Sequence, residues 1–307
     1  MCEAAWRYTR KSCTPPLRFS AARTQATTDH RNCCARRVSH PGAPQVVQEA
    51  WLVKRALRWL SVLWLGLFGL GFGLSLADSA VVHTDQPRSW RTAPRHSSGQ
   101  APDPVKHAGE AIVQVYAAPT VGWRGVFAVH PWIIYKRAGE TAYTRHEVVG
   151  WRAPDVVQRD YAVPDGLWFG STPRLLVEHR GPAAQALIGP IEAAIASYPY
   201  ADRYRSFPGP NSNTFLAHIG RAVPGLALDL PANAIGKDYR DLTDPLGISP
   251  SGSGVQLTLA GLLGASVGWQ EGVEFNVLGL SFGVDWNTPA LRLPFVGRLG
   301  WSDAPPL

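Results

Sequence analysis

The middle of the chain concentrates apolar residues in short segments, as β-strands do. The sequence predicts strands over residues 111–117 (AIVQVYA), 125–136 (GVFAVHPWIIYK) and 141–151 (TAYTRHEVVGW), and a weaker one over 175–180. The Ala138-Gly139-Glu140 turn makes the second and third strands a hairpin. Pro131 removes a backbone donor from the second strand, so we expect an edge or a bulge there.

A helical spacing of apolar residues replaces the strand pattern after residue 183. Residues 183–198 carry this spacing at Leu187, Ile188, Ile191, Ala194, Ile195 and Tyr198. Gly189-Pro190 interrupts the segment, which predicts a kink or two short helices. A second helix is predicted over residues 214–221, with Phe215, Leu216 and Ile219 on one face.

The pattern changes again after Pro250. Residues 254–269, 272–286 and 290–301 are glycine-rich and partly alternating, without a helical stripe. They predict paired hairpins or a small sheet. A second membrane segment is the alternative, but Gln270, Glu271 and Glu274 interrupt the apolar run and argue against it.

These elements together predict an α+β fold, an antiparallel sheet with a few helices, preceded by one N-terminal transmembrane helix. The expected divisions are a basic extension (1–50), a membrane anchor or signal segment (51–77), a linker rich in Ser, Pro, Arg and Asp (78–106), an α+β core (107–245), and a glycine-rich β part packed on that core (246–307).

The membrane prediction rests on residues 60–77 (LSVLWLGLFGLGFGLSLA), which carry no charge. As a helix they would span about 27 Å, enough for a hydrocarbon core. Lys54, Arg55 and Arg58 precede them, so the N-terminus should stay inside and the main domain should cross. A cleaved signal peptide is the alternative, because Ser75-Leu76-Ala77 resembles a cleavage site. A buried soluble helix fits less well, since the segment holds four glycines.

Charge and cysteine are concentrated before the predicted membrane segment. Residues 1–59 hold 11 Lys/Arg and 3 Asp/Glu, whereas residues 60–307 hold 19 and 20. The near-neutral body gives no electrostatic basis for a nucleic-acid partner. Cys2, Cys13, Cys33 and Cys34 all precede residue 50, so the body has no cysteine nucleophile or thiolate site. Met1 is the only Met, and one hypothesis places the true translation start near residues 46–53.

Ser212 and His130 are the candidate catalytic pair. Ser212 follows a Gly-Pro-Asn turn at a helix start, where free N–H groups can activate a nucleophile and stabilise an oxyanion. His130 lies in an apolar strand and is the best candidate base. The alternatives are a semi-buried structural histidine and, for Ser212, an N-cap, for which Asn211, Ser212 and Asn213 all qualify. Capping is the expectation we favour for Ser212.

Either His146 or Glu147 could orient the base. Because they are adjacent on a strand they point to opposite faces, so only one can reach His130. The face of the strand that carries His146 is less polar, which suggests that it faces the protein interior and favours His146. A carboxylate is the more usual partner of a base, which favours Glu147. His218 is expected to face elsewhere. Asn211, Asn213, Trp132 and Tyr204 are candidate ligand-binding residues. No His/Asp/Glu cluster shows metal-ligand spacing, so neither a metal nor another cofactor is expected.

Three segments carry a family resemblance. AVHPWIIYKRAGETAYTRHEVVGWR, SYPYADRYRSFPGPNSNTFLAHIGRAVP and LDLPANAIGKDY together resemble the bacterial family called domain of unknown function 3750. The resemblance covers roughly residues 80–300, and GPNSNTF is its most specific piece. It implies an anchored or exported protein of the bacterial cell envelope and assigns no activity.

A more distant resemblance is to circularly permuted papain-like hydrolases and acyltransferases, such as the lecithin-retinol acyltransferase group. There a strand with His followed by "-x-x-I-Y" precedes an "Asn-Cys-x-x-Phe" helix start. Here His130 precedes Trp132-Ile133-Ile134-Tyr135, and Asn211-Ser212-Asn213-Thr214-Phe215 follows. Ser212 stands where that group has Cys, so the resemblance implies either serine chemistry or a fold kept for binding.

Two functions follow as expectations. The first is a membrane-anchored envelope protein of the inner membrane, with its main domain on the periplasmic side, that is non-catalytic or of unassigned activity and binds an envelope peptide, glycan or lipid. The alternative is a serine-dependent hydrolase or acyltransferase on an envelope amide or ester. In that enzyme Ser212 is the nucleophile, His130 the base, and Glu147 or His146 its partner.

Overall fold

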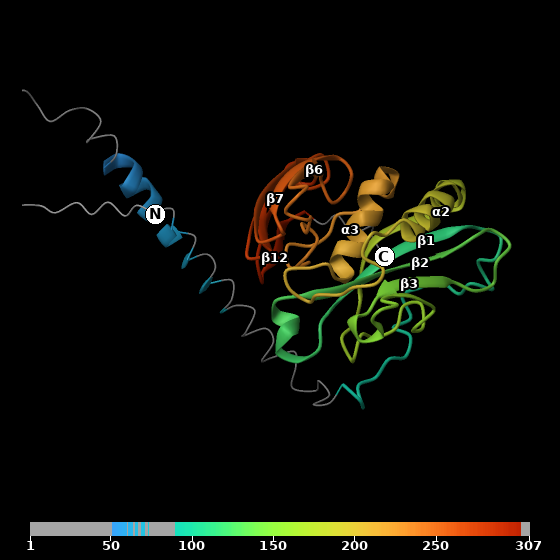
Figure 1. Cartoon of the computed structure of the whole chain (residues 1–307). Coiled ribbons are helices and arrows are strands. Elements are labelled where there is room, and N and C mark those ends of the chain that lie inside the picture. The colour runs from blue at the N-terminus through green and yellow to red at the C-terminus, as the bar shows by residue number, and fades with distance from the viewer. Residues whose placement is uncertain are drawn as a thin grey trace, which may run out of the picture. The chain divides into compact units, whose positions relative to one another are not determined.

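A computed structural model describes residues 51–59, 61–63, 65–66, 69–70, 73 and 90–301 (Figure 1). The predicted extension over 1–50 and parts of the predicted anchor and linker lie outside these residues. Within them, no helix is long and apolar enough to span a lipid bilayer. The fold class is confirmed at the level of an α+β protein with antiparallel sheets and few helices.

The first sheet has five antiparallel strands in the order β4-β3-β2-β1-β5. The strands are β1 (Ile112–Pro119), β2 (Val129–Lys136), β3 (Thr144–Val148), β4 (Val157–Arg159) and β5 (Arg174–Arg180). The predicted hairpin of the second and third strands is confirmed. The 3-10 helices η2 (Gly122–Val126) and η3 (Gly150–Arg152) follow β1 and β3, so the second strand begins four residues later than predicted.

β2 is a central strand, although its first half is paired on one side only. It pairs with β1 along its whole length, from Val129↔Pro119 to Lys136↔Ile112. With β3 it pairs only over Ile133–Tyr135. Pro131 therefore lies in the half that has no β3 partner, where a missing N–H breaks no ladder on that side. The edge character predicted from Pro131 is confirmed only for this half-strand.

Alternation along the strands divides the first sheet into two faces. Helices α2 (Gly181–Ala196) and α3 (Ser212–Ala222) cover the face that carries Val113, Val115 and Ile133. The opposite face carries Tyr116, Trp132 and Ile134, and packs against Ala93, Trp168 and Phe169. On β3, Arg145 and Glu147 are buried while Thr144 and His146 are half-buried, so the expectation that the His146 face is the more interior one is wrong.

The segment predicted to be helical over residues 183–198 forms one continuous helix that ends at Ala196. α2 keeps Pro190 inside it, so of the two predicted outcomes, a kink or two short helices, the second is wrong. Its buried residues Ala184, Ile188, Ile191 and Ala194 recur at three- and four-residue spacing and pack on the sheet. The short 3-10 helix η4 (Pro224–Leu226) follows α3.

The C-terminal region, for which paired hairpins or a small sheet were predicted, forms one antiparallel sheet of seven strands. Its strand order is β12-β11-β10-β9-β8-β7-β6. The strands are β6 (Leu246–Ile248), β7 (Gly254–Leu259), β8 (Leu263–Gly268), β9 (Gly272–Val277), β10 (Leu280–Asp285), β11 (Ala290–Leu293) and β12 (Gly297–Gly300). Each strand pairs with the next along the chain, which makes the sheet a meander.

The second sheet buries its polar face and exposes its apolar face. Gln256, Thr258, Ser266, Glu274 and Asn276 are buried, whereas their strand neighbours Val255, Leu257, Val267 and Phe275 are exposed. This reverses the usual arrangement of a one-sided antiparallel sheet, in which the apolar face is covered.

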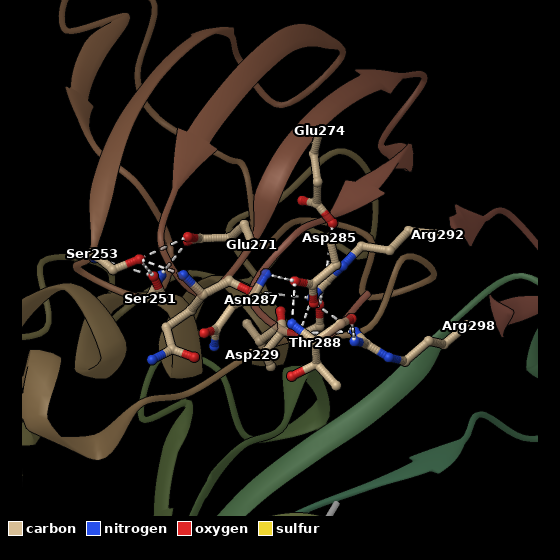
Figure 2. Close-up of polar contacts among 12 residues, drawn as sticks. Asp229, Ser251, Ser253, Glu271, Glu274, Asp285, Asn287, Thr288, Arg292 and Arg298 are labelled. Atoms are coloured by element: carbon tan, nitrogen blue, oxygen red, sulfur yellow. Dashed lines mark hydrogen bonds and ion pairs between the residues drawn. The ribbon is translucent and has the colours of Figure 1, made fainter. Parts of the chain in front are cut away.

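An ionic network lies under the polar face (Figure 2). Arg292, only 4 % exposed, lies 3.0 Å from Glu274 and 3.3 Å from Asp285, and also pairs with Asp229. Arg298 binds Asp285 at 2.7 Å. The buried charges are thus paired with one another, as buried ions require.

The segment 229–240 connects this network to α3. Lys237 pairs with Glu274, and the Asp238 carbonyl accepts a hydrogen bond from Gln256 at 3.0 Å. Burial lowers the pKa of Lys237, but the carboxylates of Asp238 and Glu274 outweigh it and raise that pKa above its ordinary value. Arg221, at the end of α3, donates to the Lys237 carbonyl at 3.0 Å and to Gln256 at 2.8 Å.

Candidate functional site

The site centres on His130, near the start of β2. Its Nε2 lies 2.9 Å from Oε2 of Glu147 on β3. The His130 side chain is 5 % exposed and that of Glu147 is fully buried. Of the two candidate orienters, the structure therefore brings Glu147 to His130.

Arg145 fixes Glu147 in turn. Both residues are on β3, two positions apart, so their side chains share a face. Arg145 Nε lies 2.8 Å from Glu147 Oε1, and Nη2 donates to Oε2 at 3.0 Å. The guanidinium also donates to the Val163 carbonyl at 2.7 Å and lies 4.2 Å from the centre of the Trp132 ring. A planar two-pronged donor of this kind holds a carboxylate in one orientation.

These contacts determine the protonation of the pair. Burial lowers the pKa of His130, and Arg145 lowers it further, although Glu147 opposes them. Burial raises the pKa of Glu147, but His130 and Arg145 outweigh it and the pKa falls below its ordinary value. At neutral pH the imidazole is therefore neutral and the carboxylate charged. Nε2 then carries the proton that Glu147 accepts, which leaves Nδ1 as a lone-pair acceptor.

Aromatic rings enclose the imidazole. Trp168 stacks on His130 with ring centres 3.6 Å apart and planes 5° apart. The segment before Trp168 is tied to residues 98–101, because Asp165 accepts backbone hydrogen bonds from Gln100 at 2.7 Å and Ala101 at 3.1 Å. Residues 98–101 fall within the predicted linker, and here they contact the folded domain.

Asn211, and not Ser212, is the N-cap of α3. Its side chain accepts from the N–H groups of Asn213 and Thr214 at 2.9 and 3.2 Å, and the Thr214 hydroxyl accepts from the Asn211 N–H at 3.1 Å. This is a capping box. The capping role favoured for Ser212 from the sequence is wrong, because Ser212 is the first helical residue.

Ser212 begins the buried stripe of α3. Phe215, Leu216 and Ile219 follow it at three, four and seven residues, and all three are fully buried against the first sheet. Ser212 itself is 3 % exposed. Its position on this stripe directs it to the sheet side of the helix and not to solvent.

The helix start lies against the half of β2 that β3 leaves unpaired. Asn213 Nδ2 donates to the Val129 carbonyl at 3.1 Å and to the Ile235 carbonyl at 2.8 Å. Val129 and Asn213 are the sequence neighbours of His130 and Ser212. Among the described residues, however, no hydrogen bond joins Ser212 to His130, and the His130 side chain is on the Trp132 face of the sheet.

The other candidates are placed apart from this pair. His146 stacks on Tyr135 with ring centres 5.9 Å apart, on the helix-covered face. Trp132 is fully buried, and its Nε1 donates to the Pro164 carbonyl at 2.8 Å. Tyr204 packs on Gly150. His218 Nε2 donates to the Ala194 carbonyl at 3.0 Å, as expected of a histidine outside the site.

Sequence reasoning missed Arg145 and Trp168. Arg145 had a usable signal, since a charged residue two positions from Glu147 on a strand must share its face. Trp168 had none, because it reaches His130 from a loop 38 residues away along the chain. No group of three His, Cys, Asp or Glu side chains in the described part of the chain is arranged to hold a metal ion.

Comparison with known proteins places this region in a family. Residues 110–239 match the family described as protein of unknown function (DUF3750), and this part of the chain belongs to it. The matched region runs from just before β1 to Tyr239, so it includes His130, Arg145, Glu147 and Ser212. No curated protein and no solved structure matches the chain significantly.

Proposed function

We propose that the first sheet and α3 form the catalytic centre of a hydrolase or acyltransferase that acts on an ester or amide. The observation that carries this proposal is the arrangement Arg145–Glu147–His130, in which a buried carboxylate, clamped by a guanidinium, orients a neutral imidazole. A base oriented by a third group is what an activated nucleophile requires. Three buried titratable groups in contact are also costly to a purely structural core.

Ser212 is the proposed nucleophile. It is at the N-terminus of an 11-residue helix, where the helix dipole favours a developing oxyanion. The bond from Asn213 to Val129 supports a short separation between this helix start and the strand that carries His130. Because α3 covers one face of the sheet and the His130 side chain is on the other, we place the contact between Ser212 and His130 at the edge of β2 that β3 leaves unpaired. The order of His strand and helix start, and the resemblance to permuted papain-like enzymes with Ser in place of Cys, support the same assignment.

The proposed reaction proceeds in two transfers. Ser212 Oγ attacks the carbonyl carbon of the substrate while its proton passes to Nδ1 of His130. The imidazolium, stabilised by Glu147, then gives this proton to the leaving alcohol or amine. The acyl group remains on Ser212 until water or another acceptor attacks, again with His130 as the base.

Labelling with a fluorophosphonate, which reacts with activated serines, tests the proposal. We expect labelling of the wild type, none of Ser212→Ala, and unchanged labelling of Ser206→Ala, an exposed serine six residues earlier. His130→Gln should abolish labelling, and Glu147→Gln should slow it by at least about a hundredfold. If the wild type is not labelled at any pH, or if Ser212→Ala is labelled equally, the enzyme assignment fails.

A non-catalytic binding domain is the second candidate. The near-complete burial of His130, Glu147 and Arg145 supports it, because these side chains would then only hold the sheet together. Its ligand would be an envelope peptide, glycan or lipid. In that case the fluorophosphonate would not label Ser212, and Glu147→Gln would lower stability alone.

We also propose that the domain lies on the periplasmic side of a bacterial inner membrane, to which residues 60–77 anchor it. The support for this location is the uncharged stretch and the basic residues that precede it. Protease treatment of spheroplasts would test it. Digestion of residues 90–301 in spheroplasts that remain intact is the expected result, and protection until lysis would contradict it.

A further inference from the structure

The second sheet presents an apolar face that residues 90–301 leave largely exposed, although Leu280 at one end of it is buried. Val255, Val267, Val273, Val284, Leu291 and Leu299 are successive cross-strand partners and form one row across β7–β12. Leu257, Ala265, Phe275 and Phe282 form the next row, and the two Phe rings stack at 5.9 Å. Every position on this side of β7–β11 is Val, Leu, Ala or Phe.

This face is exposed to a degree unusual for a monomeric protein. Val255 is 61 % exposed, Leu257 54 %, and Val284 52 %. Isolated exposed apolar residues are ordinary, but a continuous apolar patch over six strands is much larger and indicates a contact surface. The polar residues of the same strands point into the protein, where the ionic network around Arg292 pairs their charges. The sheet can therefore be stable with its apolar side exposed.

Three tryptophans mark one edge of the face. Trp269, Trp286 and Trp301 each follow directly after a strand, β8, β10 and β12 respectively. Alternate strands of an antiparallel meander end at the same edge, so the three indoles form a row there. Alternation places them on the apolar side, and they are 63 %, 45 % and 69 % exposed. Indoles favour the boundary between hydrocarbon and water, where lipid headgroups lie.

We propose that this face docks on a lipid bilayer, with the Val, Leu and Phe side chains in the acyl region and the tryptophan row at the headgroups. A second copy of the chain fits less well, because protein interfaces place Trp near their centre and here it lies at the rim. The strands have six residues or fewer and cover roughly 20 Å, whereas spanning strands need about 9–11 residues.

The sheet therefore lies flat on one leaflet. Its end strands β6 and β12 leave backbone groups unpaired, and such groups cannot enter hydrocarbon. Docking by side chains alone keeps the backbone at headgroup level, where water and headgroups can satisfy it. This inference does not depend on the proposed chemistry at His130 or on an anchor at residues 60–77.

An environment-sensitive fluorophore on single cysteines tests the docking in the full-length chain. Cys2, Cys13, Cys33 and Cys34 are replaced by Ser, and Leu257→Cys, Val284→Cys or Ala186→Cys then carries the NBD label. Ala186 is an exposed position on α2 and is the matched control. Phosphatidylcholine vesicles should shift NBD emission to the blue and raise it severalfold at 257 and 284, and not at 186.

Since the face is uncharged, the vesicle signal should persist in high salt. A nitroxide lipid should quench the label at 257 and 284. The proposal is overturned if vesicles change neither label, or change all three labels equally. The proposal is also overturned if the blue shift appears without lipid. A blue shift that rises with protein concentration would assign the apolar face to contact with a second copy of the chain. A blue shift that persists at every dilution would assign the face to contact with another segment of the same chain.

Discussion

Replacing Glu147 by Gln should strongly destabilise the first sheet. The substitution keeps the size of the side chain and removes a charge that is completely buried. Arg145, 1 % exposed, then keeps its hydrogen bond to Val163 but loses its only described carboxylate partner. Breaking a buried ion pair in this way costs about 3–5 kcal/mol, because one charge is left without compensation.

Urea denaturation followed by tryptophan fluorescence would measure this loss. With a slope of about 2–3 kcal/mol per molar urea, the midpoint should fall by about 1–2 M. The double variant Arg145→Met/Glu147→Gln should recover about 1–3 kcal/mol, since it removes the unpaired charge as well. Lys106→Gln, which breaks an ion pair at the surface, is the control and should leave the midpoint unchanged. If Glu147→Gln lowers the midpoint no more than Lys106→Gln does, Arg145 and Glu147 do not form the buried pair described above.

Three further predictions concern other features. Acid should destabilise the protein. Burial lowers the pKa of His130, His146 and His218 in the folded protein, and the pKa of Glu147 is lowered as well. The free energy of unfolding is therefore highest above about pH 6.5, and it falls as the pH drops from there through the pKa values of the folded protein. His130→Gln should reduce the difference in urea midpoint between about pH 7.5 and pH 5, and an unchanged difference would show that His130 does not contribute. Gly236→Ala should lower the free energy of unfolding more than Gly139→Ala. Both glycines have φ near +95° (96° and 93°), so the backbone strain is matched. A Cβ at 236 would lie 2.5 Å from the Asn211 amide, whereas a Cβ at 139 would have no atom within 4 Å. Equal melting temperatures would contradict a rigid cap at Asn211. Arg292→Met should lower the melting temperature more than Arg298→Met. Loss of Arg298 leaves Asp285 and Asp229 with Arg292, whereas loss of Arg292, the more buried of the two, takes a cation from Asp229, Glu274 and Asp285 at once. The reverse order would show that Arg298 is the main partner.

The local pattern of the sequence was enough to predict four of the five strands of the first sheet and α3, but not β4. The turn at Ala138–Glu140 predicted the β2–β3 hairpin, and the stripe Phe215, Leu216, Ile219 predicted α3. The cap was predicted wrongly at Ser212, because Asn211, Ser212 and Asn213 are all good caps and the choice depends on where the chain turns. Gly236 and Ile235, distant in sequence, fix that turn by their contacts with Asn211.

Strand alternation separates two faces but does not say which face is covered. On β3 it predicted that only one of His146 and Glu147 reaches His130, and the structure selects Glu147 through Arg145 and the loop at Trp168. On the second sheet the rule that apolar faces are covered fails. Its polar face is buried because Asp229, Lys237 and Asp238 arrive from elsewhere in the chain with matching charges.

The ionic partners of the segment 229–240 have a consequence for how this protein can evolve. The family match ends at residue 239, but Lys237 and Asp238 depend on Glu274 and Ser281, beyond that end. A recombination event that joined residues 110–239 to an unrelated C-terminal region would remove Glu274, the nearer of the two carboxylates paired with the buried ammonium group of Lys237, and leave it only Asp238. The same segment holds the start of α3 through the Ile235 carbonyl, so the disturbance would reach Ser212. The second sheet can therefore be exchanged only for one that brings its own acidic residue to Lys237, and substitutions at positions 237 and 274 should change together among relatives that keep both sheets.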